Sequence, residues 1–133
     1  MSTPEFRAAE SRTVTVSARP RWNRTGVRVE QGATYRLSAD GIWCDRRIRC
    51  GPAGYPSRTW LFRLVERLRR HPTAPWFALI GTVGGARTTR FVIGSSTVWT
   101  APATGELHCF ANDLPGMRFN NSGDVRLTVM APT

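Results

Sequence analysis

The chain has 133 residues, of which 41% are hydrophobic, and its formal net charge is +10. This length favours one domain with its own core, and no apolar run reaches the roughly 18 residues that a membrane span needs. All 19 basic side chains are Arg, a bias that arises either from an anionic partner or from the codon usage of a GC-rich genome.

The start of the chain, residues 1–10, is expected to form a flexible tail, and residues 11–133 a single β-sandwich domain. The opening sequence MSTPEFRAAESR contains acids and no apolar segment, so it does not resemble a secretory signal. A cytoplasmic location is the default expectation, with release or non-classical export as the alternative.

Short segments in which apolar and polar side chains alternate follow this tail and predict β-strands. The alternation begins at residues 13–18 and recurs at 27–29 and 35–39. Asp40 and Gly41 are then expected to break or bulge the third strand. Short strands about ten residues apart, separated by Gly and Pro turns, are typical of a β-sandwich.

The middle of the chain has a different periodicity. Within residues 57–70, SRTWLFRLVERLRR, one helical face would carry Leu61, Leu64, Val65 and Leu68. The simplest interpretation is a surface helix laid across one end of the sandwich. The alternative is a basic amphipathic helix that meets an anionic surface.

Strand patterns resume after this helix. They lie at residues 76–81, 90–94, 98–102, 105–111 and 124–130. The total of about eight strands is that of a jelly roll. The predicted fold class is therefore all-β, a jelly-roll β-sandwich with one inserted short amphipathic helix.

Residue types that support zinc binding or catalysis are sparse. The two histidines stand far apart, and Cys44, Cys50 and Cys109 lack CxxC spacing, which argues against a zinc centre. Cys44 and Cys50 either close a small disulfide loop or stay reduced. No nucleophile elbow, phosphate loop or placed carboxylate pair occurs, so we expect that the protein is not an enzyme.

One segment, NDLPGMRFNNSG at residues 112–123, concentrates oxygen donors. Asp113 offers a carboxylate, and Asn112, Asn120 and Asn121 offer amide carbonyls. Such donors suit Ca²⁺, whereas softer metals prefer nitrogen and sulfur. A plain turn explains the same composition equally well, and one carboxylate would need help from a neighbour such as Asp45.

The stretch GELHCFANDLPGMRFNNSGDVRLTV resembles the C-terminal part of the PA-I galactophilic lectins, a family of bacterial calcium-dependent galactose-binding proteins. The motif N-D-x-P-G-x-x-x-N-N-S-G matches without a gap, and weaker similarity covers most of residues 13–130. The resemblance implies a jelly-roll sandwich with Ca²⁺ at its rim and a sugar whose vicinal hydroxyls coordinate the ion. Because single sites of this kind bind weakly, useful avidity would require a homo-oligomer.

The resemblance also assigns residue roles. The implied calcium ligands are Asp45, Asp113, Met117, Asn120 and Asn121. Met117 would contribute its backbone carbonyl, and Asp45 matches a family position whose carbonyl ligates the ion. The implied sugar contacts at these motifs are Asp45, Asp113, Leu114 and Asn120.

The sequence departs from the family at residues 55–75, where the family carries a His and a Gln that hold the sugar. The predicted basic helix stands there instead, and Tyr55, Arg58 and Trp60 are the candidates to contact a sugar face. The prediction of calcium binding therefore rests on residues that are present, whereas the prediction of galactose specificity rests partly on residues that are replaced.

The alternative function is a basic module that keeps the lectin fold and binds polyanions. It would use the Arg groups at residues 46–49 and 63–70. Acidic glycan is one candidate partner, and nucleic acid is a less favoured one because no nucleic-acid-binding motif occurs.

Overall fold

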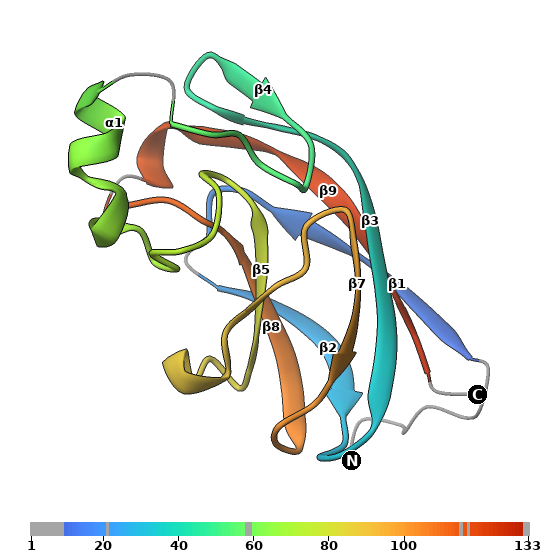
Figure 1. Ribbon diagram of the computed structural model, residues 1–133. Helices are drawn as coiled ribbons and strands as arrows, with labels where there is room; N and C mark the ends of the chain where they lie inside the picture. Colours follow the sequence, from blue (N-terminus) through green and yellow to red (C-terminus); the bar gives the residue numbers. More distant parts are fainter. Residues whose placement is uncertain (1–9, 21, 58–59, 115, 117, 132–133) are drawn as a thin grey trace.

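Two antiparallel sheets face each other in the computed structural model, which describes residues 10–20, 22–57, 60–114, 116 and 118–131 (Figure 1). One sheet is formed by β1 (Ser11–Ser17), β9 (Asn121–Met130), β3 (Thr34–Asp45) and β4 (Ile48–Cys50), with β7 (Ser96–Thr100) also paired to β3. The other is formed by β2 (Asn23–Val29), β8 (Gly105–Ala111), β5 (Leu79–Val83) and β6 (Phe91–Val92). The predicted all-β sandwich is confirmed, with nine strands in the described ranges.

Alternate residues of each strand fill the space between the sheets. On β9, Val125, Leu127 and Val129 are at most 1% exposed, as the alternation predicts. Trp43 of β3 meets Phe77 edge to face, with ring centroids 5.5 Å apart. Because a slip of one residue would turn such a strand's apolar set to solvent, this pattern fixes the register of the sheet.

Strand β3 runs unbroken through Asp40 and Gly41, so the predicted interruption is wrong. Its pairing with β9 shows no register shift. Gly41 takes φ +115 inside the ladder, which glycine tolerates, and a Cβ there would lie 3.1 Å from the Val125 Cα atom. The continuous strand carries Asp45 to the end of the sheet, where it pairs with Asn121.

The predicted helix is shorter than expected and is rotated about its axis. Residues 57–70 contain α1 (Trp60–Leu64) and the 3₁₀ turn η1 (Glu66–Leu68). Leu61, Leu64 and Leu68, assigned to the buried face, are 57%, 68% and 62% exposed. Val65, the fourth residue of the predicted face, does pack against the core, and it is joined there by Phe62, which was not predicted.

An aromatic cluster explains this rotation. The Phe62 ring lies 5.4 Å from the Trp76 ring and 6.5 Å from the Tyr55 ring, between centroids. Packing a Phe ring between two other rings removes more apolar surface from water than a leucine would. These contacts come from distant parts of the chain, so helical periodicity alone does not reveal them.

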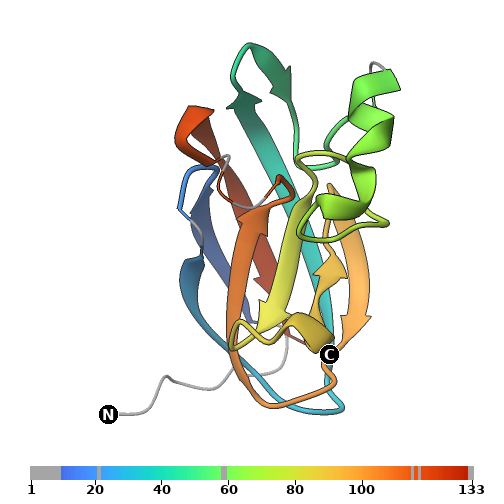
Figure 2. The same ribbon diagram turned by 90° about the vertical axis from the view of Figure 1, so that its left-hand side faces the viewer.

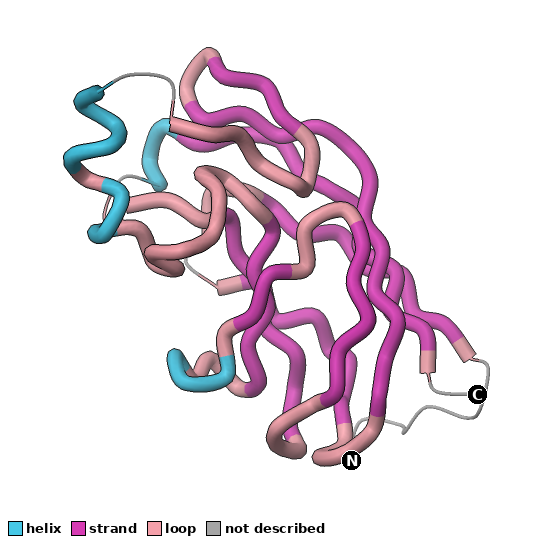
Figure 3. The backbone as a smooth tube through the Cα atoms, viewed as in Figure 1, coloured by secondary structure: helices cyan, strands magenta, loops and turns pink. Residues whose placement is uncertain are grey.

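The helix α1, the 3₁₀ turn η3 and one hairpin gather at the same end of the sandwich. Figures 2 and 3 show α1, the β3–β4 hairpin and the turn η3 (Arg118–Asn120) at this end, whereas η2 (Arg87–Thr89) lies beside β5 and β6. Among the described residues, no helix is long and apolar enough to cross a membrane. We call the end that carries α1, the hairpin and η3 the loop end.

Cys44, Cys50 and Cys109 form no disulfide in the structure, which therefore does not support a bridge between Cys44 and Cys50. The two side chains are not directly opposed, because Cys50 pairs with Trp43 and Cys44 with Arg49. Cys109 is fully buried, as expected, and burial raises the pKa of its thiol.

Candidate cation and ligand site

The segment after β8 is fastened across the loop end by Asn112, which is fully buried. Its side-chain oxygen accepts the His71 N–H at 2.8 Å. Its amide donates to the carbonyls of His71, Ala74 and Pro75 at 3.0, 3.2 and 3.0 Å. The amide oxygen of Asn112 is therefore engaged in holding the segment that follows η1, a structural role that sequence patterns did not predict.

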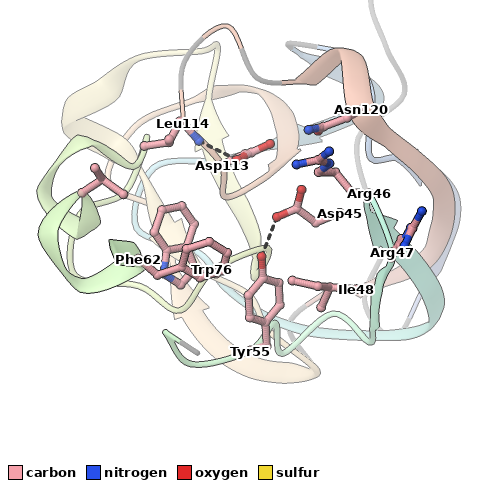
Figure 4. Close-up of a pocket in the computed structure, with 11 residues that line it drawn as sticks. Asp45, Arg46, Arg47, Ile48, Tyr55, Phe62, Trp76, Asp113, Leu114 and Asn120 are labelled. Carbon is pink, nitrogen blue, oxygen red and sulfur yellow. Dashed lines mark hydrogen bonds between the residues drawn. The ribbon is translucent and has the colours of Figure 1, made fainter. Parts of the chain in front are cut away.

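Four of the five predicted metal ligands lie together at the loop end. Asp45 pairs with Asn121 across β3 and β9, and the Arg46 N–H donates to the Asn120 carbonyl at 3.0 Å. Asp45, Asp113 and Asn120 line one pocket of about 550 Å³ (Figure 4). The fifth, Met117, lies outside the described residues.

Three buried oxygens of this group have no hydrogen-bond partner within the described part of the chain, namely Asp113 Oδ2, Asn120 Oδ1 and Asn121 Oδ1. The other polar atoms of two of these side chains are engaged. Asp113 Oδ1 accepts the Leu114 N–H at 2.7 Å, and Asn121 Nδ2 donates to the Ala18 carbonyl at 3.1 Å. Each unpartnered buried polar atom costs about 1–3 kcal/mol, so these three oxygens are candidates to bind a cation.

The environment of Asp113 disfavours the ionised form of its carboxyl group. Asp113 is 6% exposed; its burial, together with the nearby charge of Asp45, raises its pKa from 3.8 to about 6, while the Leu114 N–H and the Asn121 side chain oppose the rise. The Tyr55 hydroxyl donates to Asp45 Oδ2 at 2.5 Å. Burial and this hydrogen bond raise the pKa of Tyr55, so Tyr55 stays a donor to the Asp45 carboxylate.

The donor set fits a hard cation. It consists of carboxylate and amide oxygens, which suit Ca²⁺ and similar ions, whereas zinc and copper sites use nitrogen and sulfur. The described residues contain no group of three or more His, Cys, Asp or Glu side chains that could hold a metal. Amide oxygens would therefore have to complete the coordination that Asp45 and Asp113 begin.

Apolar and aromatic side chains form the rest of the pocket wall. Tyr55 and Leu114, both predicted sugar contacts, line it, and so do Phe62 and Trp76, which the sequence did not indicate. One feature of the sequence could have indicated Phe62. It stands three residues before Val65 in the helical segment, a spacing that places both on one helical face, but the leucine pattern is more conspicuous. Figure 4 shows the three rings on one side of the two carboxylates.

The structure does not bring Trp60 to this pocket. Its side chain is 73% exposed on α1, and it is absent from the described lining. Arg58 lies outside the described residues. Arg46 and Arg47, from the β3–β4 turn, line the pocket and place two positive charges at the proposed ligand site.

Two non-glycine residues in the described ranges have a positive φ, and both lie near this pocket. Arg46 has φ +56 and Phe77 has φ +60. Left-handed backbone costs about 1–3 kcal/mol in a non-glycine residue and is often found at functional sites. Phe77 is held by its N–H, which donates to the Asn112 carbonyl at 2.7 Å.

The fold and the pocket together define a two-sheet, all-β domain with an oxygen-rich loop over an aromatic wall. No protein-family model matches the chain, and no curated protein matches its sequence. Among solved structures, the chain is similar to the N-terminal domain of EclA, described as a PllA-like lectin. The TM-score is 0.68 at 20% sequence identity, over 90% of this chain and 94% of that one. At this identity the similarity shows that the two chains share a fold.

Proposed function

We propose that the protein binds carbohydrate in a calcium-dependent manner and holds galactose or a related sugar through vicinal hydroxyls. The observation that carries this proposal is the set of three unpartnered buried oxygens on Asp113, Asn120 and Asn121. These are the same side chains that the lectin-like motif assigns to the ion. The lectin-domain fold of the neighbouring structure supports the proposal independently of that motif.

Each group of the pocket has a distinct task in this proposal. The oxygens of Asp45, Asp113, Asn120 and Asn121 hold the ion. Bound Ca²⁺ supplies open coordination positions, where two adjacent sugar hydroxyls replace water. Asp113 and Asn120 accept hydrogen bonds from those hydroxyls, which fixes their orientation.

The aromatic wall takes the less polar face of the sugar. Ligand pockets of about 300–1,000 Å³ combine mostly apolar walls with a few placed polar groups, and this pocket of about 550 Å³ has that composition. Phe62 and Tyr55 stand in the segment where the lectin family carries its sugar-holding His and Gln. The contacts that select one sugar from another therefore differ from those of the family, while the demand for two adjacent hydroxyls is retained.

A glycan array tests this function when it is probed with Ca²⁺ and again with a chelator. The array is repeated with Asp113→Asn and with the matched control Asp124→Asn, because Asp124 is an exposed acid of β9. We expect glycan binding that is lost with chelator and in Asp113→Asn but retained in Asp124→Asn. Binding that survives both chelator and Asp113→Asn would exclude the proposed role of the loop.

A further inference from the structure

A second pocket, of about 540 Å³, shares Asp113 with the first pocket and is also lined by Asn121. Five arginine residues line it, namely Arg67, Arg69, Arg70, Arg87 and Arg90. They come from two segments, one at η1 and one at η2, that only the fold brings together. We propose that this pocket binds the oxyanion of an acidic saccharide, either a sulfate or a carboxylate group.

Several of these side chains are held in place before any ligand arrives. The Arg70 guanidinium lies 3.5 Å from the centroid of the Phe110 ring and 4.6 Å from that of Trp22. Stacking fixes the guanidinium plane and leaves its N–H groups directed along that plane. Arg90 Nη1 donates to the Arg70 carbonyl at 2.9 Å, and the Arg69 Nε–H donates to the Glu66 carbonyl at 2.9 Å.

The charges in the pocket are unbalanced. Among the described residues, the ion pairs do not include Arg67, Arg87 or Arg90. Asp113 is the one acid in the described lining, and it belongs equally to the proposed cation site. Positive charges gathered in a concave site attract anions more strongly than the same charges spread over a surface.

A neighbouring titratable group experiences the same field. Burial lowers the pKa of His71, and the charges of Arg90 and Arg69 lower it further. The arginine-lined geometry of the pocket and the lowered pKa of His71 therefore both indicate a positive electrostatic potential. Planar guanidinium groups recognise carboxylate and sulfate-type oxyanions with paired, charge-assisted hydrogen bonds, which sets the class of ligand.

The shape of the site favours a saccharide over a nucleic acid. Its volume suits a sugar-sized group, and it shares a wall with the proposed neutral-sugar site. One oligosaccharide would thus place its hydroxyls at the first pocket and its acidic substituent at the second. The anion-binding part of this inference rests on the second pocket's own residues and does not require a calcium site, whereas the choice of a saccharide rests on the proposed carbohydrate-binding function.

The test uses galactose 6-sulfate, galacturonic acid and galactose as probes, titrated calorimetrically into the full chain with chelator present. Ionic strength is held constant with sodium chloride. The pocket variant is Arg67→Gln/Arg87→Gln, in which both replaced side chains are exposed. The matched control is Arg36→Gln/Arg126→Gln, which removes the same charge from exposed positions of β3 and β9. A thermal melt without ligand confirms that both variants fold.

We expect both acidic sugars to bind the wild type more tightly than galactose does. The pocket variant should lose about tenfold in affinity, because two charge-assisted hydrogen bonds are removed, and the control should change by less than about twofold. Equal weakening of both variants would overturn the proposal, and so would an equal affinity for galactose and its acidic forms. Single-stranded oligonucleotide that binds more tightly than the acidic sugars, and through the same arginines, would overturn the assignment to a saccharide.

Discussion

Replacing Asp113 by Asn should stabilise the calcium-free protein and remove its response to calcium. The Asp113 carboxyl is 6% exposed, and its pKa is raised from 3.8 to about 6. At 1.36 kcal/mol per pKa unit, keeping the side chain ionised at neutral pH costs the folded state about 3 kcal/mol. An amide removes that cost, and its oxygen can still accept the Leu114 N–H.

The size of the stabilisation by Asp113→Asn depends on pH. Because the folded pKa of Asp113 lies above the unfolded value of 3.8, its contribution to stability is fully present below about pH 3.8 and is lost as the pH rises through about 6. The gap between the variant and the wild type should therefore be small at pH 4. At pH 7.5 it should reach about 2–3 kcal/mol, or about 10 °C in Tm for a domain of this size.

Urea unfolding and thermal melts in chelator, at both pH values, measure this gap. Repeating the melts with millimolar calcium should raise the Tm of the wild type and leave that of Asp113→Asn unchanged. The reasoning is refuted if the variant is less stable than the wild type at pH 7.5 in chelator, or if the gap does not change between pH 4 and pH 7.5.

Three further substitutions test the surroundings of the site. Asn112→Ala removes four hydrogen bonds from a fully buried side chain and should cost about 3 kcal/mol or more in urea unfolding; a loss under about 1 kcal/mol would contradict its role. Gly54→Ala places a Cβ 2.2 Å from the Trp76 carbonyl oxygen at φ +76 and should lower the Tm more than the control Gly26→Ala, which has φ +73 and open space; equal losses would show that backbone strain alone decides. Arg46→Gly removes a cation from the pocket and should tighten calcium binding severalfold by calorimetry, whereas weaker binding would show that Arg46 helps to hold the site.

The strands and the oxygen-donor content of the loop could be predicted because each depends on a few residues that are close together in the sequence. The alternation through Val125, Leu127 and Val129 fixes the buried face of β9 without reference to any other segment. The acid and amides of residues 112–123 likewise stand close together in the chain. Such local patterns do not depend on contacts with distant segments. For this reason the predictions of a sandwich and of clustered oxygens agree with the structure.

The parts that were missed depend on contacts between distant segments. The helical face was assigned to Leu61, Leu64, Val65 and Leu68. Of these only Val65 packs against the core, and Phe62 joins it there through contacts with the rings of Tyr55 and Trp76. The second pocket is lined by residues from both 67–70 and 87–90. Nothing in the sequence of either segment predicts that the two lie side by side. The placement of Asp45 near Asp113 needed the family resemblance, because the two belong to segments that no local pattern connects.

Calorimetric titration of calcium into the metal-free protein tests the central claim most directly, with magnesium as the comparison ion. We expect one calcium ion to bind per chain, more tightly than magnesium, and Asp113→Asn to bind none. A site with a Kd of about 10⁻⁴ M would stabilise the fold by over about 1 kcal/mol at millimolar calcium. Absence of both heat and a Tm shift at millimolar calcium would contradict the account.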